Sequence, residues 1–186
     1  NLPITAYVMV LRGYLTIRQG RSFDESRQGV LLIEQAFAQL AALPVPDRTT
    51  LTMQGAAAVE LAFGYTVDDE IEKAVTLAQE AIDLNLKAGN SLAGLSARSL
   101  LAQLTCAQGR WRQAAHILQD GLAQAQTWTN ALQLSGTSPP STAPLLLGMG
   151  MILYQWNDLE NATPLIEEAD DLYALTGAIN RAEGLI

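Results

Sequence analysis

The sequence contains one cysteine and one histidine among 186 residues, and this scarcity limits the chemistry that the chain can support. A single cysteine excludes a disulfide bond within the chain. Protein zinc sites usually combine several Cys and His side chains, so the chain is short of the common ligands. We therefore predict no metal site in this chain.

Basic residues are also few, with 11 Lys and Arg against 19 Asp and Glu, which gives a formal net charge of −8. A surface this acidic repels phosphate groups, so we predict that this segment binds neither nucleic acid nor an anionic membrane surface. The longest near-continuous apolar run, residues 143–154, is shorter than the ~20 residues that span a bilayer. No basic segment followed by an apolar one opens the chain, as a signal peptide would require. We expect a cytoplasmic protein.

Signals for β-strands are nearly absent, because the chain has no alternating Val/Ile/Thr runs and no Asn-Gly or Asp-Gly turns. Good helix formers dominate instead, and apolar residues recur three and four positions apart, as in Ile71, Ala74, Val75 and Ala78. This pattern predicts an all-α fold class.

Helix boundaries follow from capping signals. Ser22 with Glu25, Asp69 with Glu72, and Asn157 with Glu160 each fit a capping box, in which a short polar residue and an acid satisfy free amides at a helix start. Glycines and prolines mark the ends. The predicted helices are 4–19, 23–43, 48–66, 69–88, 91–108, 111–129, 143–156 and 158–176, with a ninth from about 178.

The helices group into pairs that carry a repeated pattern of small residues. In the third pair it runs Leu101-Ala102, Gly109, Trp111, Ala114 and Leu118, and this resembles the tetratricopeptide signature. The resemblance implies a right-handed superhelix of about four antiparallel helix pairs, at about 4–43, 48–88, 91–129 and 143–176. The one long connection is a loop at 134–142. We interpret 1–186 as a single helical-repeat domain.

A narrower resemblance rests on the stretch 147–162, Leu-Gly-Met-Gly-Met-Ile-Leu-Tyr-Gln-Trp-Asn-Asp-Leu-Glu-Asn-Ala. It is similar to a motif of large ATP-binding LuxR-type transcriptional regulators of the MalT-like group, with Gln155 in place of the usual glutamate. Further segments follow in the family's order. They are Arg12-Gly13-Tyr14-Leu15, Leu43-Pro44 with Asp47-Arg48, Leu100-Leu101-Ala102-Gln103 with Gln108-Gly109-Arg110, and Ser138-Pro139.

This resemblance implies the sensor part of a regulator whose ATPase domain precedes it and whose helix-turn-helix domain follows it. The chain has no Walker A motif and begins with Asn1 instead of methionine. We therefore expect a segment of a longer protein, without a cofactor of its own, since ATP and DNA would bind on the absent domains. The expected partner is an unknown small-molecule inducer or a protein. A general tetratricopeptide scaffold for protein–protein interaction is the alternative.

Catalysis has little support in the sequence. Cys106 and His116 could act as nucleophile and base only if they met in space, and no neighbouring motif indicates that they do. The acidic runs at 68–70 and 167–171 lack the pattern of a cation site and fit a helix start and a solvated face. We predict no catalytic residues and a non-enzymatic protein.

Ligand binding is the better-supported role, because the first helices of such pairs line a concave surface. Candidate ligand-binding residues on this face are Tyr14, Phe63, Arg98, Gln103, Met151 and Tyr154, and Ile17 is also expected there. The alternative for the aromatics is packing against neighbouring helices. Arg98 could bind a ligand carboxylate or phosphate, or extend outward to water.

Residues 121–157 include no Asp, Glu, Lys, Arg or His. Such a stretch indicates either burial or a contact surface. The sequence does not decide whether this stretch or the concave face makes the contact.

Overall fold

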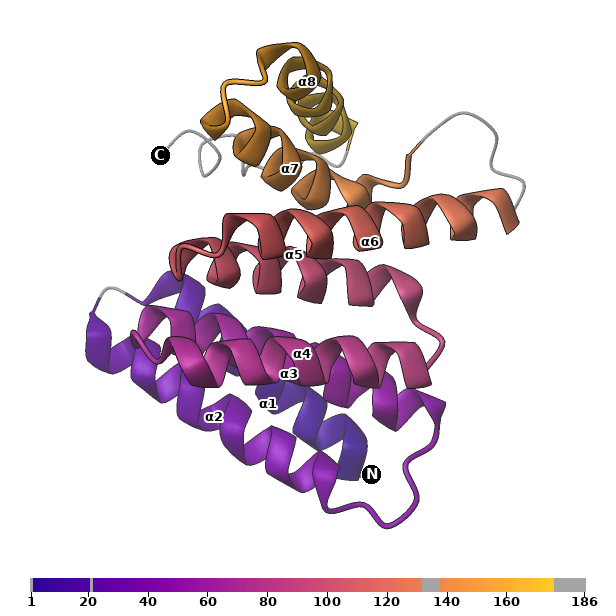
Figure 1. Cartoon of the computed structure of the whole chain (residues 1–186). Helices are drawn as coiled ribbons and strands as arrows, with labels where there is room; N and C mark the ends of the chain where they lie inside the picture. Colours follow the sequence, from indigo (N-terminus) through magenta and orange to yellow (C-terminus); the bar gives the residue numbers. More distant parts are fainter. Residues whose placement is uncertain (1, 21, 132–137, 176–186) are drawn as a thin grey trace. The chain divides into compact units, whose positions relative to one another are not determined.

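The computed structural model describes residues 2–20, 22–131 and 138–175, which form helices and no strand (Figure 1). The predicted all-α fold class is confirmed. The elements in chain order are α1 (Leu2–Gln19), α2 (Phe23–Ala41), α3 (Arg48–Val67), α4 (Ile71–Lys87), α5 (Ser91–Ala107), α6 (Trp111–Ala131), the 3-10 helix η1 (Pro140–Thr142), α7 (Ala143–Gln155) and α8 (Leu159–Leu175).

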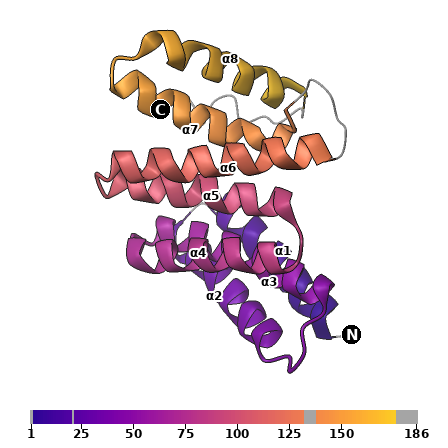
Figure 2. The ribbon, with the colours of Figure 1, turned by 45° about the vertical axis from the view of Figure 1, so that its right-hand side comes forward.

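The helices pack as the predicted pairs, with α1 against α2, α3 against α4, and α7 against α8 (Figure 2). The chain divides into two compact units, Asn1–Leu100 and Leu101–Ile186, with the division inside α5. The single domain and the right-handed superhelix stay predictions. Within the predicted loop 134–142, Pro140–Thr142 form η1, and residues 134–137 lie outside the described residues. The ninth helix from about 178 also lies outside them.

Small residues set the distance between the helices of a pair. In the first pair a Cβ added to Gly13 of α1 would lie 2.6 Å from the carbonyl oxygen of Gly29 in α2. In the last pair a Cβ on Gly150 of α7 would lie 2.6 Å from Cγ1 of Ile166 and 3.3 Å from the carbonyl oxygen of Ala162 in α8. The two pairs therefore cross at equivalent positions, which explains the small residues of the repeated sequence pattern.

Four helices end in the same backbone motif, in which a left-handed residue follows the helix. At the end of α5, the amide of Gly109 donates to the carbonyl of Cys106, and the amide of Arg110 donates to that of Thr105. The ends of α3, α4 and α7 repeat both bonds. The left-handed residues are Asp69, Gly89, Gly109 and Asn157, with φ of 60°, 64°, 77° and 59°.

This motif corrects two of the predicted capping boxes. Asp69 and Asn157 end the preceding helices instead of starting the next ones, which begin two residues later at Ile71 and Leu159. Short polar side chains tolerate the left-handed conformation, and that preference prevailed over capping here. For the third box the N-cap is confirmed, since the Ser22 side chain accepts a hydrogen bond from the Glu25 amide, 3.2 Å away.

A pair of substitutions tests the backbone requirement. Gly109→Ala should lower the free energy of unfolding by about 1 kcal/mol, because an added Cβ meets no atom within 4 Å and only the positive φ is unfavourable. Asn157→Gly should raise it by a few tenths to about 1 kcal/mol, since glycine adopts the same conformation without strain. Urea unfolding measures both changes. Equal changes of the same sign in the two variants would contradict the left-handed conformation of Gly109 and Asn157.

Candidate functional site

Two aromatic rings and an arginine come together on the first unit, between α1 and α3. The guanidinium carbon of Arg18 lies 5.4 Å from the centroid of the Tyr14 ring and 4.9 Å from that of the Phe63 ring. Contacts of this length between a guanidinium and a ring face are favourable cation–π interactions. Tyr14 and Arg18 are four residues apart on one face of α1, and Phe63 approaches from α3.

An acid completes this group. Burial raises the pKa of Glu60, one turn before Phe63 in α3, to about 7, and the positive charge of Arg18 opposes the rise. We call Tyr14, Arg18, Glu60 and Phe63 the aromatic–arginine cluster. Both rings are half-buried, so the cluster offers apolar surface beside a cation and a carboxyl group that changes charge near neutral pH.

The raised pKa has a consequence for stability. The folded chain holds the Glu60 proton more tightly than the unfolded chain, so the free energy of unfolding should fall as pH rises from about 4.5 to about 7. When pH is raised from about 5 to about 8, the free energy of unfolding should fall in the unmodified chain. In Glu60→Gln this fall should be smaller by about 2–3 kcal/mol. Urea unfolding at both pH values measures this difference. Glu80→Gln, on the exposed face of α4, is the control and should leave the pH dependence unchanged.

The structure brings together two of the six predicted ligand-binding residues, Tyr14 and Phe63, through Arg18. Arg98 is half-buried in α5, in the first unit. Gln103, Met151 and Tyr154 belong to the second unit, where all three are exposed, Met151 by 49% and Tyr154 by 61%. Ile17 was wrongly expected on the concave face, because it is buried against Gly29 of α2.

A second polar group links α2, α3 and α4. Arg27 of α2 forms an ion pair with the buried Asp68 and lies 3.7 Å from Glu70. The hydrogen bond to Asp68 raises the pKa of Arg27, and the pairing of Glu70 with Lys73 lowers the pKa of Glu70. Asp68 Oδ2 pairs with Arg27, whereas its buried Oδ1 has no hydrogen-bond partner among the described residues. The ion pairs of this group are typical of a structural network that fixes neighbouring helices.

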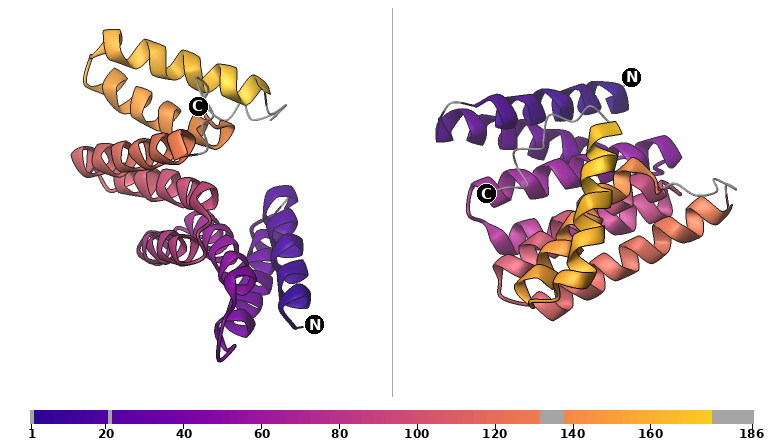
Figure 3. Two further views of the ribbon diagram at one scale, coloured as in Figure 1. Left: turned by 90° about the vertical axis from the view of Figure 1, so that its right-hand side faces the viewer. Right: turned by 90° about the horizontal axis from the view of Figure 1, so that it is seen from above.

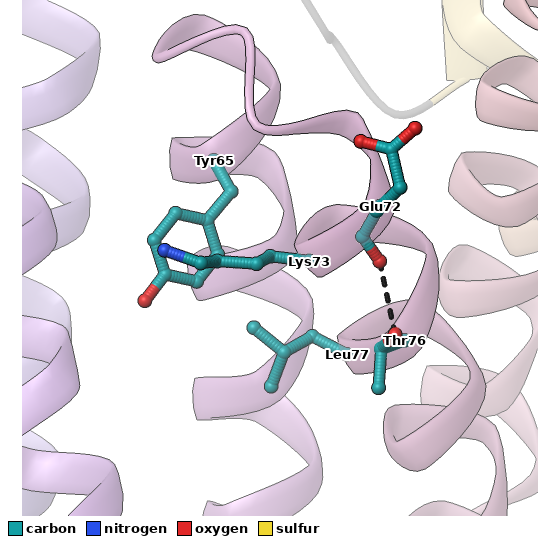
Figure 4. Close-up of a pocket in the computed structure, with 5 residues that line it drawn as sticks. All are labelled: Tyr65, Glu72, Lys73, Thr76 and Leu77. Carbon is teal, nitrogen blue, oxygen red and sulfur yellow. Dashed lines mark hydrogen bonds between the residues drawn. The ribbon is translucent and has the colours of Figure 1, made fainter.

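Tyr65 lies beside this network and lines a shallow pocket of about 360 Å³ with Glu72, Lys73, Thr76 and Leu77 (Figure 4). The ammonium of Lys73 lies 5.2 Å from the centroid of the Tyr65 ring, and the phenol donates a hydrogen bond to Glu34. Burial, followed by the bond to Glu34, raises the pKa of Tyr65. The phenol therefore stays protonated and is unsuited to act as a base at neutral pH.

A second shallow pocket, of about 550 Å³, lies in the second unit. Its lining includes Trp111 at the start of α6, Trp156 at the end of α7, and the two arginines Arg110 and Arg112. The tryptophans are 40% and 47% exposed. Its charge is positive in a chain of net charge −8.

Cys106 and His116 are the candidates for catalysis that the sequence contains. Burial raises the pKa of the Cys106 thiol, which reduces the thiolate that a nucleophile needs, and His116 is exposed on α6. In the described part of the chain, no three His, Cys, Asp or Glu side chains gather closely enough to hold a metal ion. None of the described helices is long and apolar enough to cross a membrane.

The uncharged stretch 121–157 is partly core and partly exposed. Ala143 and Leu146 of α7 pack with Ala169 and Leu172 of α8, and α6 packs against α7. The other face of α7 exposes Met151 and Tyr154. Burial therefore accounts for the apolar face of α7, and residues 132–137 lie outside the described part.

Sequence reasoning missed Arg18 and Glu60, although each left a signal. Arg18 follows Tyr14 by four residues, so the two side chains share one face of a helix. Glu60 is the single acid within Arg48–Val67, a helix otherwise rich in alanine and apolar residues. A lone charge on such a helix is costly to bury without a partner, and that cost points to a cation nearby.

Comparisons with known proteins identify the fold. No family model matches the chain, and no curated protein matches it. Among solved structures, the chain is similar to kinesin light chain nearly identical TPR-like repeats from Podosopora anserina. One such structure has a TM-score of 0.62 at 19% identity, covering 90% of this chain and 76% of that one. Another has a TM-score of 0.51 at 16% identity, covering 91% and 97%.

The chain is also similar to BtubC (BKLC) from P. vanneervenii, with a TM-score of 0.55 at 13% identity over 95% of this chain and 84% of that one. At these identities the likeness concerns the fold alone. The chain has a tetratricopeptide-like helical-repeat fold, as the spacing of its small residues predicts.

Proposed function

We propose that this chain is a non-catalytic helical-repeat module that binds a protein partner through the face of α1 and α3. The aromatic–arginine cluster carries the proposal. Its two half-buried rings offer apolar contact, and Arg18 offers a cation for an acidic group on the partner. Aromatic and arginine side chains are the types most often responsible for binding energy at protein interfaces.

The raised pKa of Glu60 adds a condition to this binding. Above about pH 7 the Glu60 carboxylate competes with an acidic partner for the positive charge of Arg18, whereas below that pH Glu60 is protonated and no longer competes. Binding of an acidic segment through this face should therefore strengthen as pH falls from about 8 to about 6.

A peptide array probed with the chain tests the proposal. The chain should retain acidic segments that also carry apolar side chains, and the double variant Arg18→Glu with Phe63→Ser should lose at least about tenfold in affinity for them. Trp111→Ser, an exposed aromatic in the second unit, is the matched control and should retain the same segments. Absence of any retained segment, or equal retention by the double variant, would refute the proposed face.

A finer proposal concerns the protein in which the module works. We propose that it is the sensor of a MalT-like LuxR-type transcriptional regulator, on the strength of the motif at 147–162. Two residues of that motif serve the fold: Gly150 permits the close crossing with α8, and Asn157 supplies the left-handed turn. The other helix pairs likewise have small residues at the crossing and left-handed residues after a helix. The resemblance to the LuxR-type regulators therefore depends on exposed residues that the fold does not require, above all Tyr154 and Trp156.

Two observations separate a sensor from a general scaffold. The complete reading frame should encode an ATPase domain before this segment and a helix-turn-helix domain after it. A thermal-shift screen with sugars, nucleotides and other metabolites should also find a stabilising ligand, since a compound at ~100 times its dissociation constant adds about 2.7 kcal/mol. A frame without either domain would refute the sensor while leaving the protein-binding module intact.

A further inference from the structure

α1, the indigo helix that begins at the N-terminus, lies at the edge of the first unit (Figure 3). It exposes a stripe of four aliphatic side chains. Ile4, Val8, Leu11 and Leu15 are 54%, 52%, 46% and 49% exposed. Their spacing of four, three and four residues places them on one face of the helix. The opposite face, with Ala6, Val10 and Ile17, is buried in the unit.

The later first helices show what this face does elsewhere in the fold. Aligned on the helix crossings, Val8 and Leu15 correspond to buried pairs in each later first helix. The pairs are Ala57 and Gly64 in α3, Ala97 and Leu104 in α5, and Leu145 and Ile152 in α7. Exposure of this face is therefore peculiar to α1 among the four.

In two of these cases the covering element is known, and it is a helix. A Cβ on Gly64 of α3 would meet Cγ2 of Val30, in α2, at 2.7 Å. In α7, Gly148 corresponds to Leu11, and a Cβ there would meet the side chain of Leu118, in α6, at 3.3 Å. The stripe on α1 thus has the form of a helix-packing surface.

We propose that the occupant is α1 of a second copy of this chain, packed antiparallel across a two-fold axis. The stripe reads the same in both directions, so a two-fold axis between Val8 and Leu11 aligns Ile4 with Leu15 of the other copy and Val8 with its Leu11. Such self-complementarity is what a symmetric dimer requires of a single patch.

Charge favours the antiparallel orientation over the parallel one. Arg12 borders the stripe, and α1 has no acidic residue. A parallel pair would place the two Arg12 side chains at the same height, whereas the antiparallel pair separates them by about 7.5 Å along the axis. The antiparallel orientation also aligns the two helix dipoles favourably.

The exposed face of α8 is a poor partner for the stripe. Aligned with α2, the face of α8 that would cover a following helix contains Glu160, Thr163, Glu167 and Asp170, and all four are exposed. Such a face is polar. Head-to-tail association of copies would bury these acids against aliphatic groups, so the symmetric pairing is preferred.

The size of the stripe sets the strength of the dimer. Four half-exposed aliphatic side chains present a few hundred Å² per copy, below the roughly 800 Å² per partner of a standard interface. We therefore expect a reversible dimer with a dissociation constant in the range of about 10 to about 500 µM.

Sedimentation of the chain from about 5 to about 500 µM tests this. The mean mass should rise from 20.0 kDa toward twice that value. Leu11→Arg should weaken the dimer at least about tenfold. Leu86→Arg, at a side chain of nearly equal exposure on α4 (47% against 46%), should change it less than about twofold. A mean mass that stays at 20.0 kDa throughout would overturn the proposal and leave the stripe to a different helix.

The antiparallel register has its own test. Val8→Glu and Leu11→Arg should each weaken self-association, yet a mixture of the two chains should form a heterodimer within about threefold of the original affinity, because the new charges face each other. Circular dichroism of each variant should show unchanged helicity, and Val8→Glu serves in place of Leu11→Arg if the latter does not fold. Failure of the mixture to associate, or equal weakening by Leu86→Arg, would overturn the proposed pairing.

Discussion

Replacing Gly29 with alanine should destabilise the first unit by about 2–4 kcal/mol. A Cβ at this position would lie 2.6 Å from the carbonyl oxygen of Gly13, 2.7 Å from Cγ1 of Ile17 and 3.0 Å from the backbone nitrogen of Ile17. Two of these three atoms belong to the backbone of α1, which cannot rotate away as a side chain can. The helices must therefore separate, and the contacts of the buried Ile17 and Ile33 would be lost with them.

Gly94→Ala is the matched control in the same unit. Gly94 lies in α5, and a Cβ added to it would meet only the Cβ of Asn85, in α4, at an ordinary contact distance of 3.8 Å. Alanine is the better helix former, so this variant should be unchanged or more stable by up to about 1 kcal/mol. Urea unfolding of both variants gives the comparison. A loss of similar size in both would show that the close approach of Gly13 and Gly29 does not limit stability.

Asn85→Asp should destabilise the first unit by about 3 kcal/mol or more at neutral pH. Asn85 is fully buried in α4, where its amide nitrogen donates to the carbonyl oxygen of Ala81 at 2.8 Å. Its amide oxygen has no hydrogen-bond partner among the described residues. A carboxylate at this place would lose the donated bond and put a charge where neither water nor a donor solvates it.

The penalty should depend on pH in a defined direction. Burial disfavours the charged form, so the folded chain would bind the proton of the new aspartate more tightly than the unfolded chain, whose aspartates have a pKa of ~3.9. The deficit should therefore be small near pH 4 and grow as pH rises. The protonated acid can again donate to Ala81, which helps stability at low pH.

Gln79→Glu makes the same chemical change on the exposed face of the same helix. It should alter the free energy of unfolding by less than about 0.5 kcal/mol, because water solvates the new charge. Chemical unfolding of both variants between about pH 4 and 8 checks the pair. A deficit for Asn85→Asp that is absent at neutral pH, or one that does not shrink in acid, would contradict the burial of this side chain.

The proposed partner-binding face shows the limit of sequence reasoning for a site. Tyr14 and Phe63 were predicted from the register of the repeats, since the repeat places both on first helices. Their common contact with Arg18 and the neighbouring Glu60 depends on how closely α1 and α3 approach, and that distance is set by other residues. The chemical character of the face, a cation between two rings beside an acid, therefore required the structure.

Helix ends show a similar division. Gly89 and Gly109 were predicted as helix ends because glycine adopts the left-handed conformation at little cost. Asp69 and Asn157 occupy the same position, yet a short polar residue before an acid fits a helix start equally well. Local preferences are balanced there, and the packing of the following helix selects between them.

The sequence by itself determined the helices, their pairing and the small residues at their crossings, because helix propensity, apolar periodicity and steric size act over a few neighbouring positions. Only the tertiary structure decided which charges meet, which polar atom of Asn85 stays unpaired and which face of α1 remains open. These features depend on residues 30 or more positions apart in many cases, as with Arg18 and Phe63. Their free energies arise from desolvation and contact between helices, and no local pattern in the chain encodes either.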